Sequence, residues 1–307
     1  MLKKILTPIY NSADLNACFI DKNYYTHHGL GHVDDVIVYV GRLLGIDENW
    51  QPNENKQIFS DDYSVFILLV SILLHDVGMY YGREGHEQKC LAVLMENKNI
   101  FNDAVENKSI SNIAKAHSGR FNESKDTLSN PELRVDQTYL GCTYDSKELA
   151  ALVRFADEIC ETKERAKSFA LSSGLVTDKS LICHKYCSYI NSVQVSPGRD
   201  SIGIEYIIPI EDVKKAVPLD GSKRFMIDEI AERLDKINKE RVYCNRYFSR
   251  CLYIRKIIAR IEVVDADYKT RFSERLSLED SGYPDQIVSI KDLYPSFSGL
   301  KYKSKKK

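Results

Sequence analysis

The sequence predicts a mainly α-helical fold, with a smaller C-terminal region in which helix and strand mix. Apolar residues recur at helical spacing over residues 31–44 and again over residues 147–159. Between these segments, the run 65–74 is apolar except for one serine, which is typical of a helix buried on all sides. Beyond about Gly174, apolar and polar residues alternate over two short arms, as in strands with one buried face. We therefore expect a helical core followed by a sheet.

The overall composition gives no reason to expect a strongly charged partner. The chain has 307 residues, enough for a large core, and its 43 Lys and Arg nearly balance its 44 Asp and Glu. Its net charge therefore provides no bulk attraction to nucleic acid or to a membrane surface. The exception is the basic tail 301–307, which we expect to be solvated; its alternative role is a phosphate-binding arm.

Cysteine usage and the apolar runs predict a cytoplasmic location. The eight cysteines are irregularly spaced, and the N-terminus carries charge without the apolar segment of a secretory signal. The apolar runs are too short for a membrane span. We expect a reducing compartment, no disulfide framework and no membrane partner.

The helices expected in the first half have start and stop signals. Gly45 closes the helix that begins near Gly31, and Asp61 or Asp62 can cap the apolar helix that follows a polar loop. Gly78 supplies a stop for that apolar helix. Three further helical patterns follow. The first begins at His86, the second ends at His117, and the third begins at Lys147.

The second half predicts a hairpin and a long helix. The two alternating arms are residues 190–195 and 202–208, and turn-forming residues join them. A long amphipathic helix is expected from Lys223 to about Tyr247. The segment 254–264 is either a further strand or a continuation of the helix.

An adjacent histidine and aspartate, His75 and Asp76, stand at the end of the apolar run. In a low-dielectric interior these two groups must be hydrogen-bonded, paired or metal-bound. Neighbouring residues of a helix point about 100° apart, so a mutual salt bridge does not by itself satisfy them. A shared metal ion would satisfy both. His32 and Asp157, each set in an apolar helical pattern, are candidates for the other ligands.

This mixture of imidazole and carboxylate ligands suits a divalent cation. Such an ion lowers the pKa of bound water and polarises a P–O bond, so the set favours phosphoester hydrolysis. For each residue alone, the alternative is structural. A buried histidine can be satisfied by hydrogen bonds, and Asp157 can form a surface salt bridge with Arg154.

Three segments carry a resemblance to a known family, namely Tyr25–His32, Leu73–Met79 and Val153–Glu158. In order and spacing they resemble the three metal-binding motifs of the HD-domain metal-dependent phosphohydrolase superfamily, over roughly residues 23–165. The resemblance implies that a divalent Mn, Fe, Mg, Ni, Co or Zn ion is bound by His32, His75, Asp76 and Asp157.

The resemblance also implies a second group of residues at the phosphate. His86 with Glu87 is similar to the arrangement in the deoxynucleotide triphosphohydrolase branch, and His117 falls where several branches place a histidine that contacts phosphate or a second metal. We expect His28 to orient a ligand. The alternative for each is an ordinary helix-terminal histidine. The candidate guanidinium groups for substrate phosphate are Arg83, Arg120, Arg154 and Arg165.

The implied organisation is an all-helical HD domain over residues 1–172, an α+β region over 173–300 and the basic tail. The expected function is that of a cytoplasmic phosphohydrolase that cleaves a phosphoester or phosphoanhydride of a nucleotide-like small molecule. It would act as a triphosphohydrolase, a phosphodiesterase or a phosphomonoesterase. The alternative is a nucleotide-sensing HD module that signals to a partner protein without turnover.

The stretch around Asp157 narrows the resemblance further. Residues 154–158 and 162–166 are similar to the last-motif stretch of HD proteins from prokaryotic conflict systems, some of them encoded beside Hsp90-like ATPases. This branch implies an Hsp90-like ATPase as a protein partner, and the C-terminal region is a candidate surface for that partner or for homo-oligomer formation.

Overall fold

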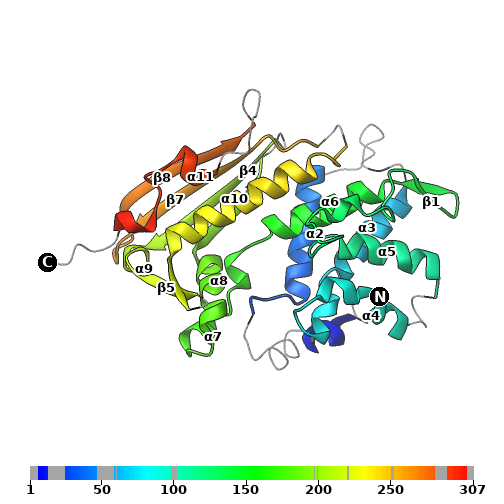
Figure 1. The fold of residues 1–307 in the computed structure, drawn as a ribbon, viewed down its shortest axis with the longest axis horizontal. Coiled ribbons are helices and arrows are strands. Elements are labelled where there is room, and N and C mark those ends of the chain that lie inside the picture. The colour runs from blue at the N-terminus through cyan, green and yellow to red at the C-terminus, as the bar shows by residue number, and fades with distance from the viewer. Residues whose placement is uncertain are drawn as a thin grey trace. The chain divides into compact units, whose positions relative to one another are not determined.

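The computed structural model describes residues 6–12, 25–46, 59, 61–97, 102–196, 198, 200–219, 221–249, 252–280 and 289–302. They divide into two compact units (Figure 1). The first unit contains the described residues up to 12, residues 28–160 and residues 244–252. The second contains residues 25–27, 161–243 and the described residues from 253 onward. The predicted boundary at residue 172 stays a prediction.

The first unit is built mainly from helices. Its α-helices after residue 12 are α2 (Leu30–Leu44), α3 (Asp62–Leu74), α4 (Cys90–Glu96), α5 (Ala104–Lys115) and α6 (Ser146–Ile159). Three 3₁₀ helices join them, at Val77–Tyr81, His86–Lys89 and Thr127–Ser129. Short strands β1 (Gln137–Tyr139) and β2 (Cys142–Tyr144) form an antiparallel hairpin.

Local signals explain where these helices begin and end. Gly45 closes α2 in the left-handed conformation, with φ of 76°, which glycine adopts at low cost. The Asp61 carboxylate accepts a hydrogen bond from the backbone N–H of Ser64 and caps α3. Of the two predicted capping residues, Asp61 and Asp62, the structure thus selects Asp61. Asp145 caps α6 in the same way. These caps satisfy backbone donors that the first helical turn leaves without partners.

The central helix α3 differs from its prediction in two respects. It is not buried on all sides, because Val65, Phe66 and Leu69 are each more than a third exposed. The expectation that every apolar run is too short for a membrane was also wrong, since the helical stretch Asp62–Tyr81 has the necessary length and composition. However, 67% of its most apolar window is buried inside the protein, as in the core helix of a globular unit.

The second unit contains a four-stranded mixed sheet in the order β3-β4-β7-β8. Its strands are β3 (Ile190–Val195), β4 (Ser201–Pro209), β7 (Lys256–Val264) and β8 (Thr270–Glu279). β4 and β7 are parallel, and the long helix α10 (Met226–Cys244) lies in the connection between them. In Figure 1, α10 runs along one face of this sheet. Alternate residues of β4 and β7 are buried, as expected for a sheet with one covered face.

The remaining elements of the second unit are short. β5 (Ala216–Leu219) and β6 (Ser222–Phe225) form a separate hairpin. The other helices are α7 (Ser168–Ser172), α8 (Asp178–Tyr189), α9 (Ile210–Val213) and α11 (Ile290–Leu293), with 3₁₀ helices at Lys163–Arg165 and Gly299–Tyr302. The predicted hairpin is confirmed by β3 and β4 and the long helix by α10, while segment 254–264 is mainly strand.

The predicted fold class is wrong. Of the described residues, 51% are helical and 20% lie in strands, which form three sheets. The first unit is not all-helical, because residues 137–144 form the β1–β2 hairpin. The strands β5, β6 and β8 were also missed. β5 and β6 are only four residues long, too short for a clear alternating pattern.

Candidate metal centre

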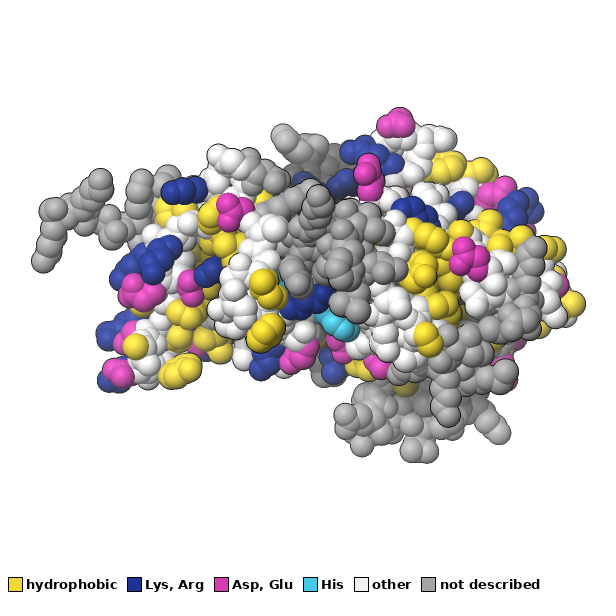
Figure 2. Space-filling view, turned by 90° about the horizontal axis from the view of Figure 1, so that it is seen from below, with side chains coloured by type: hydrophobic (Ala, Val, Ile, Leu, Met, Phe, Trp, Pro, Cys, Tyr) yellow, Lys and Arg dark blue, Asp and Glu magenta, His cyan; other side chains and the backbone are white. Residues whose placement is uncertain are grey.

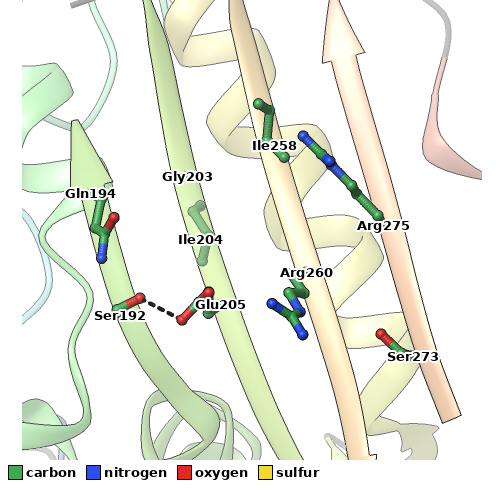
Figure 3. A pocket seen from close by; sticks show the side chains of 9 residues that line it. All are labelled: Ser192, Gln194, Gly203, Ile204, Glu205, Ile258, Arg260, Ser273 and Arg275. Atoms are coloured by element: carbon green, nitrogen blue, oxygen red, sulfur yellow. Dashed lines mark hydrogen bonds between the residues drawn. The ribbon is translucent and has the colours of Figure 1, made fainter. Parts of the chain in front are cut away.

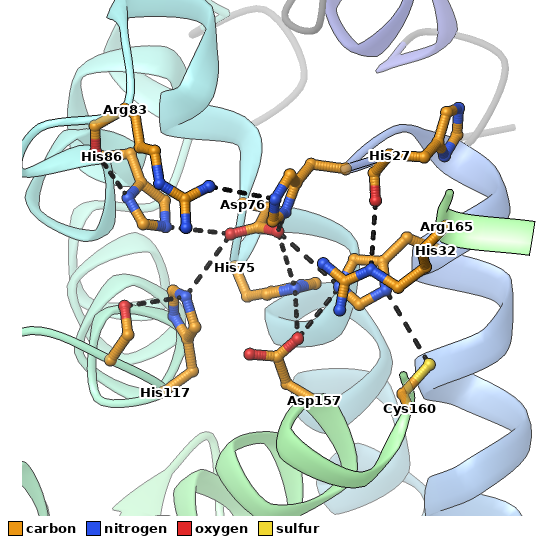
Figure 4. A network of polar contacts seen from close by, with 12 residues as sticks. His27, His32, His75, Asp76, Arg83, His86, His117, Asp157, Cys160 and Arg165 are labelled. Atoms are coloured by element: carbon orange, nitrogen blue, oxygen red, sulfur yellow. Dashed lines mark hydrogen bonds and ion pairs between the residues drawn. The ribbon is translucent and has the colours of Figure 1, made fainter. Parts of the chain in front are cut away.

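Five histidines and two aspartates converge inside the first unit (Figure 4). His28 precedes α2 and His32 lies in its first turn, whereas His75 and Asp76 follow α3 directly. The other three come from further elements: His86 begins a 3₁₀ helix, His117 follows α5, and Asp157 lies in α6. Asp76, His75 and His32 are almost completely buried. On the face drawn in Figure 2, a small patch of histidine is visible among the described residues.

Asp76 is the centre of this cluster. Its Oδ2 lies 2.8 Å from Nδ1 of His28, 3.7 Å from Nε2 of His32 and 3.4 Å from Nε2 of His75. Its Oδ1 lies 3.0 Å from Nε2 of His86 and 3.5 Å from Nε2 of His117. The two carboxylate oxygens therefore face two separate groups of imidazoles.

Asp157 completes the group on the Oδ2 side. Its Oδ1 lies 3.0 Å from Nε2 of His32 and 3.8 Å from Nε2 of His75. The structure thus brings together His32, His75, Asp76 and Asp157, the four residues predicted as ligands. His32, His75 and Asp157 form one potential metal-binding triad, and Asp76, His86 and His117 form another.

Backbone carbonyls fix the ring orientation of three histidines. The Nδ1–H groups of His75, His86 and His117 donate to main-chain oxygens at 2.7, 2.9 and 2.7 Å. In the neutral imidazole this leaves the Nε2 lone pair directed into the cluster. A metal-binding histidine is commonly held by such a bond from its other nitrogen.

The buried Nε2 atom of His75 is direct evidence for a cation site. Nε2 of His75 is inaccessible to solvent and has no hydrogen-bond partner among the described residues, although Asp76 lies nearby. A buried polar atom without a partner is costly, and a metal ion would satisfy it. The surrounding donors are imidazole nitrogens and carboxylate oxygens, a set that suits divalent transition metals. The residues present therefore fit a divalent cation.

His28 and Arg83 form a second layer around Asp76. Arg83 Nη1 donates to Nε2 of His28 at 3.2 Å, so the proton of a neutral His28 lies on Nδ1, which donates to Asp76. His28 therefore orients the carboxylate, as expected from the sequence. Arg83, one of the predicted phosphate-binding arginines, thus lies against this group of residues.

The other predicted arginines have different surroundings. Arg120 is exposed and donates to the carbonyl oxygen of Glu123. Arg154 is buried, and its Nη1 donates to Thr127 at 2.6 Å and to the carbonyl oxygen of Ala116 at 3.3 Å. Arg154 thus braces the loop that carries His117. Arg165 belongs to the second unit, where its Nε donates to the carbonyl oxygen of His27.

Two glycines allow the loops of the site to pack closely. A Cβ at Gly78 would lie 1.9 Å from the carbonyl oxygen of His86, so only glycine lets the two 3₁₀ helices approach. Gly78 was expected to stop the apolar helix, but α3 already ends at Leu74. A Cβ at Gly119 would lie 2.4 Å from the carboxylate of Glu87. Glu87 therefore packs against the loop after His117, beside His86.

Sequence reasoning missed two contacts around the cluster. The buried Tyr10 hydroxyl donates to the carbonyl oxygen of Leu73 at the end of α3. The Cys160 sulfur lies 3.8 Å from Nδ1 of His32. No motif indicates that Tyr10 contacts the site, because it lies more than 60 residues before Leu73 in the chain. Cys160 lies three residues after Asp157, and this closeness in the sequence was the only indication that its sulfur could reach the cluster.

The cluster shifts the pKa values of its members. Burial alone would lower the pKa of His75, but the charges of Asp76 and Asp157 outweigh burial and raise it to about 9. Burial alone would raise the pKa of Asp76, but the neighbouring imidazoles hold it well below its usual value. The pKa of Asp157 is lowered for the same reason, chiefly by His32.

These shifts predict that metal binding strengthens as the pH rises. A His75 pKa of about 9, above the ordinary 6.5, means that its proton stabilises the metal-free fold below pH 6.5 and that this contribution is lost as the pH rises through 9. A cation must displace that proton. We expect Mn²⁺ affinity to increase by up to about tenfold per pH unit below pH 9 for each proton displaced.

Thermal unfolding with Mn²⁺ or with a chelator, at a series of pH values from about 6 to 9, measures this effect. The melting-temperature difference between the two conditions should grow with pH. A constant or shrinking difference would show that no ligand proton is displaced.

Comparison with known proteins gives one match. A family model described as HD-CE matches residues 23–236, which include described residues of both units. Neither the curated proteins nor the solved structures give a significant match to this chain.

Proposed function

Because the chain belongs to the HD-CE family, we propose that it is a metal-dependent phosphohydrolase acting on a nucleotide or nucleotide-like small molecule. The family assignment confirms the predicted relationship to HD domains, and the conflict-system branch stays a prediction. The observation that carries the proposal is the buried Asp76, whose two oxygens face separate groups of histidines. The orphaned Nε2 of His75 beside it supports a cation there.

In this proposal, His32, His75, Asp76 and Asp157 hold the cation. A bound divalent ion would lower the pKa of a water molecule and polarise a P–O bond. His28 keeps the Asp76 carboxylate in place through the 2.8 Å hydrogen bond, and Arg83 fixes the tautomer of His28. The Asp157 side chain is about a quarter exposed, so a substrate can approach the cluster from its side.

His86 and His117 would act on the phosphate. Although burial alone would lower the pKa of His86, hydrogen bonding to Asp76 raises it in the metal-free chain and favours the protonated imidazole. A protonated His86 can donate its proton to the leaving oxygen. His117 Nε2 lies 3.0 Å from the Ser118 hydroxyl and faces Asp76 Oδ1. The lone pair of the neutral ring can therefore bind a second cation, and only a protonated ring can donate to a phosphate oxygen.

The proposal is tested by product analysis. The purified chain is incubated with Mn²⁺, Mg²⁺, Ni²⁺, Co²⁺, Fe²⁺ or Zn²⁺ and a panel of nucleoside triphosphates, deoxynucleoside triphosphates, monophosphates and cyclic nucleotides, and the products are separated by chromatography. We expect turnover of at least one substrate class, and the released phosphate, pyrophosphate or triphosphate identifies the bond that is cleaved.

The same experiment includes the outcome that contradicts hydrolysis. If the chain binds metal and a nucleotide tightly but releases no product with any metal, the alternative of a nucleotide sensor that signals to a partner protein becomes the better explanation. Metal content is measured in the same samples, so that an inactive preparation without metal is not mistaken for a sensor.

A further inference from the structure

The sheet of the second unit has a polar hollow on its uncovered face (Figure 3). The hollow has a volume of about 450 Å³ and spans all four strands. In Figure 3, α10 lies behind the sheet while the polar side chains project toward the viewer, so the hollow is on the opposite face from α10. Its lining consists of Ser192, Gln194, Gly203, Ile204, Glu205, Ile258, Arg260, Ser273 and Arg275.

Two arginines stand directly opposite each other in this hollow. Arg260 of β7 and Arg275 of β8 are register partners in the antiparallel pair. Like charges in this arrangement destabilise a sheet unless an anion compensates them. Arg260 pairs with Glu262 on its own strand. Among the described residues, the Arg275 guanidinium has no hydrogen bond or ion pair, so its donors remain available to a ligand.

The opposite wall carries neutral polar groups and one carboxylate. Oε2 of Glu205 accepts hydrogen bonds from Ser192 at 3.0 Å and from Asn191 at 3.3 Å, and Glu205 forms no ion pair with Arg260, its register partner on β7. Its other oxygen can accept from a ligand hydroxyl. The Gln194 amide and the Ser273 hydroxyl have no partners in the described part of the chain.

Gly203 creates the space between these walls. It lies in β4 opposite Gln194 and Ile258. A Cβ built on Gly203 would come no closer than 3.9 Å to a neighbouring atom. The absent side chain therefore leaves room above the strand, and a larger residue fits the backbone but fills the hollow.

We propose that this hollow is a second ligand site, which binds the phosphorylated sugar of a ribonucleotide. The guanidinium groups of Arg260 and Arg275 bind the phosphate, where charge-assisted bonds are strongest. Glu205 and Gln194 bind the sugar hydroxyls. An extended single-stranded nucleic acid is a poorer candidate, because none of the described lining residues is aromatic and base stacking has no platform. The site is separate from the metal centre and does not depend on hydrolysis.

Calorimetric titration of the full chain with ribose 5-phosphate, AMP and adenosine, in a chelator that prevents turnover, tests this site. We expect ribose 5-phosphate and AMP to bind and adenosine to bind at least about tenfold more weakly. Arg275→Gln should weaken phosphate-ligand binding by at least about tenfold, the effect of losing one charge-assisted hydrogen bond. Gly203→Val should weaken it similarly without changing any charge.

Arg271→Gln is the matched control. Arg271 lies on β8 outside the hollow and pairs with Asp265, so its loss changes net charge equally and should leave the affinity unchanged. Three results would overturn the proposal: no binding by the wild-type chain, equal weakening by Arg271→Gln, or wild-type affinity in both Arg275→Gln and Gly203→Val. Tighter binding of a short single-stranded RNA, weakened equally by Arg271→Gln, would overturn it in favour of an extended nucleic-acid surface.

Discussion

Replacing Asp76 with asparagine is expected to abolish metal-dependent hydrolysis, with a loss well above about 100-fold. Removal of a residue that only orients a metal ligand typically lowers activity by at most about 100-fold. Asp76 is placed to do more than orient, since its oxygens face His28, His32 and His75 on one side and His86 and His117 on the other. Asparagine keeps the shape but removes the charge that balances a cation among these rings.

The measurement combines turnover with metal content, determined by elemental analysis after dialysis. Asp76→Asn should lose bound metal and turnover together. Asp136→Asn is a matched control, because Asp136 is an exposed aspartate in the turn before β1, and its loss should change neither quantity. Wild-type turnover by a metal-free Asp76→Asn protein would refute the proposed centre.

Replacing Arg241 with alanine is expected to lower the free energy of unfolding by about 3–5 kcal/mol, the range typical of truncating a large, fully buried side chain. Arg241 is the largest fully buried side chain described, at 1% exposure. Its Nη1 donates to the carbonyl oxygens of Ile254 and Arg255, both at 2.8 Å, and its Nη2 to Asp280 at 2.8 Å. It therefore fastens α10 to the segment before β7 and to the residue after β8.

Alanine would leave those two carbonyl oxygens without the Arg241 donor, and it would open a cavity. The Asp280 carboxylate would keep the hydrogen bond from the Tyr253 hydroxyl. Arg241→Lys keeps the charge but has no planar fork, so it should be intermediate. Arg271→Ala removes an exposed pair with Asp265 and should cost at most about 1 kcal/mol.

Urea unfolding followed by circular dichroism compares these variants. Because the chain has two units, each transition is fitted separately. A loss below about 1 kcal/mol in Arg241→Ala would show that the buried network contributes no more than a surface pair.

The sequence predicted the four proposed metal ligands because their signals are local. A histidine and an aspartate at the end of an apolar run must be compensated, whatever the rest of the fold does. The helix periodicity around His32 and Asp157 likewise depends only on residues a few positions apart. The structure brings these four side chains together, as the sequence suggested, and their role as ligands stays a prediction.

Other features depend on contacts between segments far apart in the chain. The hydrogen bond from Arg154 to Thr127 and the open space above Gly203 cannot be predicted from the local pattern of apolar and polar residues. Arg154 was expected at the phosphate because its charge suits that role, yet its guanidinium is held by the loop after α5.

The sequence by itself therefore determined the helices α2 to α6 and α10, the β3–β4 hairpin and the residues with metal-binding chemistry, because periodicity and burial cost act on neighbours in the chain. Only the tertiary structure decided the mixed sheet and the division of histidines between the two oxygens of Asp76. β4 and β7 pair in parallel across more than forty residues of intervening chain, and their pairing depends on which surfaces α10 covers. Such choices are made by packing between distant segments, which local sequence patterns do not record.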